Sequence, residues 1–203
     1  MKRPKNRNQP IDARRYRGWV NTFSSFRHDI PEGRIRDWIG QFNAQHQDLA
    51  ARILDCVDFF THEQISGAFR AVLEGLPGWH RNSTHRTGRW RFVAYSKSAG
   101  ESGDSMLHKF RHANNLAGRQ YDELFILRSE ILSQRLGSDD TVVLIDDFAG
   151  TGQQACDAWN DQFGELLSEV GRVILVVVAA PTTAVDRVKD EAVGLELLSH
   201  HLL

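Results

Sequence analysis

Hydrophobic positions in the first part of the chain recur at intervals of three and four residues, which is the period of an amphipathic helix. One helix is expected to open at Pro31 and to continue or restart as far as Val57. A second helix is expected within 65–76, and Thr61 with Gln64 forms a capping box in front of it. The chain up to about residue 80 is therefore predicted to be helical.

The pattern changes after residue 88, where short apolar runs alternate with helical segments. Strands are predicted at 90–95, 123–127, 141–145, 172–180 and within 194–203. Helices are predicted at 105–116, 129–136, 154–170 and 183–191. Strands that alternate with helices form parallel sheets covered on both faces, so the fold class is α/β. The most apolar strands, VVLI and VILVVVA, are expected at the centre of the sheet.

Composition and charge predict three parts. Residues 1–28 form a basic and partly disordered arm, because the first 20 residues carry seven Lys or Arg and one acid. Residues 29–85 form a helical region and residues 86–203 the α/β core, whose apolar end leaves open that the core is truncated. The arm either frays in solvent or contacts nucleic acid.

The sequence contains no apolar run long enough to span a membrane, and its basic start is not followed by the apolar segment of a signal peptide. Its two cysteines lie far apart without metal-type spacing and are expected to be reduced. We therefore expect a cytoplasmic protein that does not associate with membranes.

The segment VVLIDDFAGTGQQ, residues 142–154, carries the strongest functional signal. A buried strand ends on two adjacent acids, Asp146 and Asp147, and a short loop leads from them into an amphipathic helix. The strand end offers negative charge, while the start of the helix offers free N–H groups and the positive end of a dipole. This arrangement suits a ligand with a phosphate at one end and hydroxyl groups or a metal ion at the other.

Several other nucleotide-binding interpretations of this segment fail because a residue or motif that they require is absent from the sequence. A dinucleotide fingerprint needs an acid after the next strand, which here ends on Ala179, Ala180 and Pro181. An amino-methyltransferase needs the same acid and a D/N-P-P-aromatic motif, and a P-loop needs a G-K-[ST] ending, all of which are absent. Too few elements follow residue 147 for a receiver domain. A purely structural role, in which the acids cap the helix, stays open.

The segment 142–154 resembles the signature of the phosphoribosyltransferases. In that family, two acids bind the ribose hydroxyls of phosphoribosyl pyrophosphate and the following loop binds its 5′-phosphate. The resemblance implies that Asp146 and Asp147 bind the ribose, and that they contact Mg²⁺ mainly through ligand and water. It assigns phosphate binding to the loop residues Phe148, Ala149, Gly150, Thr151, Gly152, Gln153 and Gln154.

A second loop strengthens the resemblance. The family binds pyrophosphate with a short loop after its first core strand, often with a Lys and a Gly. Here the strand that ends at Tyr95 is followed by Ser96, Lys97, Ser98, Ala99 and Gly100. The resemblance makes Lys97 a catalytic residue alongside the two acids. Four basic residues are further candidates to steer a polyanion into the cleft: Arg89, Arg91, Lys109 and Arg111.

A closer resemblance covers residues 30–200. DDFAGTGQQ, SKSAG running into GDSMLHKFR, and the helical preface are similar to phosphoribosyltransferase-like proteins of bacterial conflict and anti-phage systems. This resemblance implies a type I phosphoribosyltransferase fold with an N-terminal helical region, Mg²⁺ as cofactor, and phosphoribosyl pyrophosphate or a nucleotide as ligand. It implies an effector in anti-phage defence, with a reverse transcriptase or an ATPase as candidate partner. Homo-oligomer formation is left open.

Two residues depart from the family pattern. Phe148 is bulky where a small β-branched residue is usual, and Gln154 replaces a Thr or Ser whose hydroxyl grips the phosphate. Phosphate binding remains expected, and two functions stay open. One is a glycosyltransferase of the phosphoribosyltransferase type; the other is a catalytically degenerate module that senses a nucleotide or binds a partner.

Overall fold

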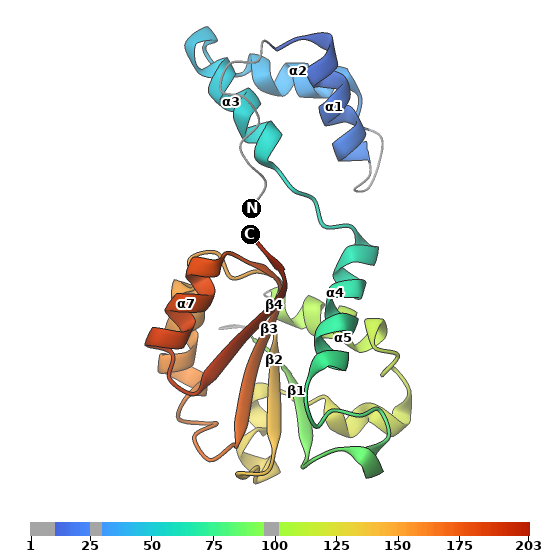
Figure 1. The fold of residues 1–203 in the computed structure, drawn as a ribbon, viewed down its shortest axis with the longest axis vertical. Helices are drawn as coiled ribbons and strands as arrows, with labels where there is room; N and C mark the ends of the chain where they lie inside the picture. The colour runs from blue at the N-terminus through green and yellow to red at the C-terminus, as the bar shows by residue number, and fades with distance from the viewer. Residues whose placement is uncertain (1–10, 25–29, 96–101) are drawn as a thin grey trace. The chain divides into compact units, whose positions relative to one another are not determined.

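A computed structural model of the chain describes residues 11–24, 30–95 and 102–203 (Figure 1). The chain divides into two units, Met1–Gln64 and Ile65–Leu203. This division lies earlier than the boundary predicted near residue 85. Helix α4 (His62–Gly75) explains the difference, because its Phe69 packs edge-on against Phe110 in the core of the second unit.

The described residues of the first unit form the helices α1 (Ala13–Ser24), α2 (Glu32–Gly40) and α3 (Ala44–Cys56). Helix α1 lies inside the stretch that was predicted as a partly disordered arm. It is ordered by an apolar face, Tyr16, Trp19 and Phe23, which is buried against α2 and α3. Asp55 on α3 accepts a hydrogen bond from the Trp19 indole (2.9 Å) and pairs with Arg15 (2.6 Å). Part of the basic charge thus holds the unit together.

The second unit is built on a parallel sheet whose strands follow the order of the sequence. The strands are β1 (Trp90–Ala94), β2 (Thr141–Ile145), β3 (Arg172–Ala180) and β4 (Leu195–Leu202), in the order β1-β2-β3-β4. All of β2 and nearly all of β3 are buried, which confirms the prediction that these apolar runs form the sheet centre. The register aligns Trp90 with Thr141 and Thr141 with Arg172.

Helices cover both faces of the sheet (Figure 1). On one face, Phe92 of β1 packs against Phe110 of α5 (Ser102–Ala113), beside α4. On the other face, a continuous apolar core joins β2 and β3 to α6 (Gln153–Ala158) and α7 (Thr182–Glu191). The α/β architecture predicted from the sequence is therefore confirmed.

The strand predicted at 123–127 is wrong. A 3-10 helix, η2 (Arg119–Leu124), occupies its first half, and only Phe125 forms a parallel bridge, with Phe92 of β1. The N–H of Ile126 donates to the Phe92 carbonyl (3.2 Å). The next N–H turns away to the Glu130 carboxylate (2.7 Å), so the pairing stops after one bridge.

Two predicted helices are also broken. The segment 129–136 forms two short 3-10 turns, η3 (Arg128–Glu130) and η4 (Leu132–Gln134), which end where Arg135 adopts a left-handed conformation (φ 47°). The segment 154–170 begins as α6 but becomes the π-helical turn η5 (Trp159–Phe163). The Trp159 indole donates to the Val193 carbonyl (3.0 Å), an anchor that periodicity alone does not reveal.

The other boundaries lie close to the predicted ones. The capping box before α4 is present, because the N–H of Gln64 donates to the Thr61 hydroxyl (3.2 Å) and the Gln64 side chain accepts from the Thr61 N–H (2.8 Å).

In the part of the chain that the structure describes, no helix has the length and apolar character needed to cross a membrane.

The winding of the chain reverses between β1 and β2. After β1 the chain crosses the face covered by α5 and returns on the outer side of β1 at Phe125. After β2 it crosses the opposite face through α6. In open α/β sheets such a reversal leaves a crevice beyond the carboxyl ends of the two strands, where ligands bind.

Candidate functional site

Asp146 and Asp147 follow β2 at this crevice, and the chain continues along β3 beyond them. The Asp146 N–H donates to the Val176 carbonyl (3.1 Å), and the Asp147 carbonyl accepts from the Val178 N–H (2.9 Å). Asp146 lines the wall of a cavity that Asp147 does not line, and the two side chains lie close enough to interact.

The cavity lies between the loop after β2 and the start of α6, and has a volume of about 260 Å³. Its rim is formed by the loop and by residues next to it: Asp146, Phe148, Ala149, Gly150, Thr151, Gly152 and Gln154. Its floor is formed by Tyr95, Ala155, Ala158, Leu175 and Val177. Most residues predicted for the ribose and phosphate thus meet in one hollow, while Gln153 binds the Asp157 carboxylate instead (2.8 Å).

The carboxylate of Asp146 is held on one oxygen. Its Oδ1 accepts hydrogen bonds from the Ser102 hydroxyl (2.9 Å) and from the Asp147 N–H (2.9 Å). The side chain of Asp147 also interacts with this carboxyl group. Burial raises the pKa of Asp146 to about 6, and the two hydrogen bonds oppose this shift without cancelling it. A partly desolvated carboxylate with a fixed orientation is suited to accept a hydrogen bond from a ligand hydroxyl.

The loop conformation depends on Gly152. Its φ of 77° lies in the left-handed region, and a Cβ there would lie 2.9 Å from the Ala184 carbonyl oxygen of α7. Within the described residues, the N–H groups of Gly150, Thr151 and Gly152 have no acceptor. Such a run of unpaired N–H groups in a turn is a typical anion-binding feature.

Phe148 lies over this loop. Its side chain is 52% exposed, and its ring is 3.2 Å from the position that a Cβ on Gly150 would occupy. Because Phe148 pairs with Ala179 through a parallel bridge, its backbone is fixed to β3. The bulky residue that departs from the family pattern therefore forms an outer wall of the cavity rather than filling it.

Tyr95 was not predicted as a site residue, yet it forms part of the floor. Its hydroxyl donates to the Ala155 carbonyl (2.6 Å), and its ring packs on Phe163 at 4.9 Å between centroids. Burial raises the pKa of its phenol. Ser102 was missed as well, because the helix was predicted to start at residue 105. A tyrosine that ends a strand directly before a predicted ligand loop was the one available signal.

The predicted pyrophosphate loop, Ser96, Lys97, Ser98, Ala99 and Gly100, lies outside the described residues. The residues that flank it border the site: Tyr95 donates its N–H to the Ile145 carbonyl (2.8 Å) and Ser102 binds Asp146. The role of Lys97 therefore remains a prediction.

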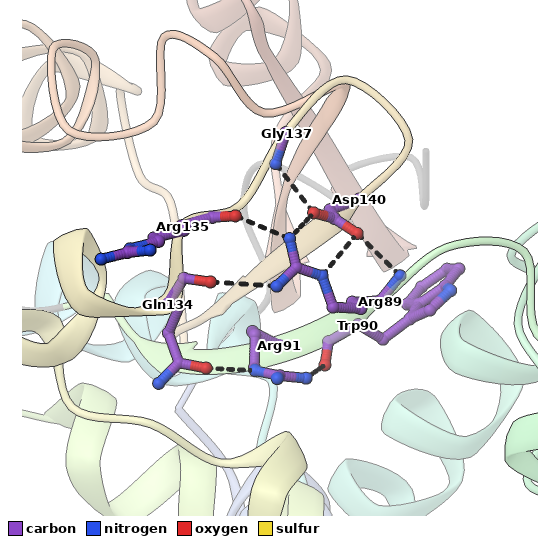
Figure 2. Close-up of polar contacts among 7 residues, drawn as sticks. All are labelled: Arg89, Trp90, Arg91, Gln134, Arg135, Gly137 and Asp140. Carbon is purple, nitrogen blue, oxygen red and sulfur yellow. Dashed lines mark hydrogen bonds and ion pairs between the residues drawn. The ribbon is translucent and has the colours of Figure 1, made fainter.

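Arg89 and Arg91 lie at the opposite end of the sheet, which corrects their predicted place at the cleft (Figure 2). Arg89 directly precedes β1, and its guanidinium pairs with Asp140, which directly precedes β2 (2.6 Å). Arg89 also donates to the carbonyls of Gln134 (3.0 Å) and Arg135 (2.7 Å). Arg91 donates to the Gln134 side chain (2.9 Å). Both arginines brace the turn before β2.

The cation that the described structure brings to the loop comes from α7. Arg187 donates through Nη1 to the Thr151 carbonyl (3.0 Å) and pairs through Nε with Glu191 (3.3 Å). Arg111, by contrast, pairs with Asp122. The sequence prediction did not include Arg187, because it lies on an element far along the chain from the motif.

The site offers few protein ligands to a metal ion. No cluster of three or more His, Cys, Asp or Glu that could hold a metal occurs among the described residues. Mg²⁺ usually keeps several waters and binds through one or two carboxylates together with substrate phosphates. The adjacent carboxylates of Asp146 and Asp147 fit that mode of binding and do not fit a complete protein cage.

Comparison with known families matches residues 35–203 to the PRTase-CE family. The chain belongs to the PRTase-CE family. The match includes the whole parallel sheet, the loop after β2 and most of the N-terminal helical region, and it supports a phosphoribosyltransferase-like function. The phosphoribosyltransferase resemblance predicted from the sequence is thereby confirmed. No curated protein matches the chain.

Proposed function

We propose that this PRTase-CE protein binds phosphoribosyl pyrophosphate, or a related nucleotide, with Mg²⁺ at the carboxyl end of β2 and transfers the phosphoribosyl group. One observation carries the proposal: an oriented, partly buried carboxylate lines the same cavity as a turn with three N–H groups that have no acceptor among the described residues. Hydroxyl groups and a phosphate joined by a five-membered sugar have the complementary chemistry.

In the proposed reaction, the bond between ribose C1 and the pyrophosphate oxygen breaks while the acceptor bonds to C1. Asp146 and Asp147 position the ribose hydroxyls, and their charge stabilises the positive charge that develops at C1. The N–H groups of the turn hold the 5′-phosphate, and the predicted Lys97 loop holds the leaving pyrophosphate. Bound Mg²⁺ would neutralise part of the pyrophosphate charge.

The second candidate is a module that senses a nucleotide and regulates a partner. Two observations favour it: the half-exposed Phe148 over the loop, and the amide Gln154 in the cavity wall where the family usually has a hydroxyl. Both leave room for binding while they alter the surroundings of the phosphate. Release of labelled pyrophosphate in the presence of a panel of acceptors separates the enzyme from the sensor.

The biological role we propose is an effector of bacterial anti-phage defence in the cytoplasm, with a reverse transcriptase or an ATPase as candidate partner. The similarity of DDFAGTGQQ and the helical preface to such proteins supports this role. The basic residues of the first 20 positions support contact with nucleic acid.

Calorimetric titration of phosphoribosyl pyrophosphate, with and without Mg²⁺, tests the binding proposal. We expect Mg²⁺-dependent binding by the native chain and its loss when Asp146→Asn is combined with Asp147→Asn. The matched control is Asp139→Asn, an exposed acid at the opposite end of the sheet, which should bind as the native chain does. A folded double variant with unchanged affinity would refute the site, and a native chain that binds no donor would refute the ligand.

A further inference from the structure

Arg187 joins α7 to the loop after β2 across 36 positions of sequence. Its guanidinium contacts two acceptors: the Thr151 carbonyl oxygen at 3.0 Å and the Glu191 carboxylate at 3.3 Å. The side chain is 37% exposed, so it is partly solvated and is not part of the apolar core. Its contact with the loop is therefore specific and polar.

This contact orients the peptide between Thr151 and Gly152. In a trans peptide the C=O of one residue and the N–H of the next lie in one plane and point in opposite directions. Because Arg187 holds the Thr151 carbonyl toward α7, the Gly152 N–H points away from α7. Helix α7 also restricts the space beside this peptide, because the Ala184 carbonyl oxygen would be 2.9 Å from a Cβ on residue 152.

Arg187 also supplies a charge that the loop lacks. The stretch 136–171, which contains the whole motif, has eight Asp or Glu and no Lys or Arg. An anion bound at the N–H groups of the loop would therefore be repelled by the acidic residues of this stretch. A guanidinium hydrogen-bonded to the loop backbone offsets this repulsion at short range.

We propose that Arg187 is a positioning residue of the phosphate-binding turn, and that it makes the turn selective for the 5′-phosphate end of the ligand. It holds the Thr151 carbonyl so that the Gly152 N–H faces the phosphate oxygens. This inference rests on the proposed function. It predicts that loss of Arg187 weakens binding of a ribose 5-phosphate group and spares binding of pyrophosphate.

The test uses the full chain and two probes, ribose 5-phosphate and inorganic pyrophosphate with Mg²⁺, each titrated by calorimetry. Arg187→Ala should weaken ribose 5-phosphate binding about tenfold, as loss of a hydrogen bond from a charged group predicts, and leave pyrophosphate affinity unchanged. Arg187→Lys should restore most of the affinity, because an ammonium can also donate to the Thr151 carbonyl. Glu191→Gln, which removes the ion pair and keeps the loop contact, should bind at least as tightly as the native chain does.

Equal loss of both probes without rescue by lysine would overturn the inference, and so would unchanged ribose 5-phosphate binding by Arg187→Ala. A second measurement needs no ligand. In the NMR spectrum of the free protein, Arg187→Ala should shift the Gly152 amide resonance and lower its order parameter, while Arg187→Lys should not. If the native chain binds neither probe, the proposed function fails, and an unchanged Gly152 amide in Arg187→Ala is then the result that refutes the positioning role.

Discussion

At the scale of one residue, the Asp146 carboxylate combines a fixed orientation with a predicted role in ligand binding. One carboxylate oxygen is fixed by the Ser102 hydroxyl and the Asp147 N–H, so the side chain has a defined direction. The side chain of Asp147 interacts with the same carboxyl group. Partial burial raises the pKa of Asp146 to about 6, which means that the charged form is destabilised in the folded chain.

We expect Asp146→Asn to stabilise the ligand-free protein at pH 8. The folded pKa of about 6 lies above the ordinary value of about 3.9 in the unfolded chain. The protonated carboxyl therefore contributes stability that is complete below about pH 4 and is lost as the pH rises through about 6. Melting temperatures in a chelator should show the variant a few degrees above the native chain at pH 8, with the gap closing toward pH 4.

Asp139→Asn is the matched control, because that acid is exposed and lies at the opposite end of the sheet from the site. Groups that titrate in both proteins cancel in the difference between native chain and variant. An Asp146→Asn variant that melts below the native chain at pH 8 would contradict the claim that this carboxylate is destabilising.

At the scale of the element, the two glycines of the loop after β2 differ in how well they would tolerate a side chain. Gly152 has a positive φ, and a Cβ there would meet the backbone oxygen of Ala184, which cannot move without α7. Gly150 has no such constraint, because its nearest neighbour is the ring of Phe148, which can turn aside. We expect Gly152→Ala to lower the free energy of unfolding by about 2 kcal/mol.

Gly150→Ala is the control and should change the free energy of unfolding by about 0.5 kcal/mol or less. Denaturation in urea measures both values. Equal effects of the two substitutions would show that the contact between the loop and α7 does not set the loop conformation.

The sequence predicted an element correctly where its hydrophobic pattern was compatible with only one position in the fold. The continuous apolar runs of β2 and β3 could only be central strands, and the two acids after β2 could only lie at the sheet edge. The pattern failed where pairing decided the outcome: Phe125 forms one bridge to β1 and the chain then turns to Glu130. The periodicity of a segment reflects that segment alone and carries no information about the strand with which it pairs.

The site was predictable in its motif and not in its surroundings. Asp146 and the loop are contiguous, so their arrangement can be read from thirteen residues. Tyr95, Ser102 and Arg187 reach the loop from other elements, and only the winding of the chain brings them there. The same limit explains the misplacement of Arg89, whose position at the start of β1 puts it at the far end of the sheet.

The second unit uses the two ends of its sheet for different purposes. The carboxyl ends of β1 and β2 border the cavity, while Arg89 and Asp140 join their amino ends (Figure 2). Asp140 is buried, and it accepts hydrogen bonds from the N–H groups of Arg89 (2.8 Å) and Gly137 (2.8 Å) as well as from the guanidinium. Burial alone would raise the pKa of Asp140, yet these hydrogen bonds keep it below its usual range.

We expect Asp140→Ala to lower the melting temperature by about 5 °C, because three sets of donors lose their acceptor. Its control, Glu196→Ala, removes the solvent-exposed ion pair with Arg172 and should change the melting temperature by about 1 °C or less. At a temperature where both variants are folded, ligand affinity should be unchanged in each. Weakened binding in a folded Asp140→Ala variant would show that the two ends of the sheet are coupled.

The contact between Arg187 and Thr151 also sets an order of events during synthesis. The arginine follows the loop by 36 residues, so at 5–20 residues per second it leaves the ribosome roughly two to seven seconds later. In that interval β2 and the loop exist without the helix that orients them. A nascent chain therefore lacks the contact that orients its phosphate-binding turn until α7 has been made, and binding of a ribose 5-phosphate group at full affinity becomes a late step in its biogenesis.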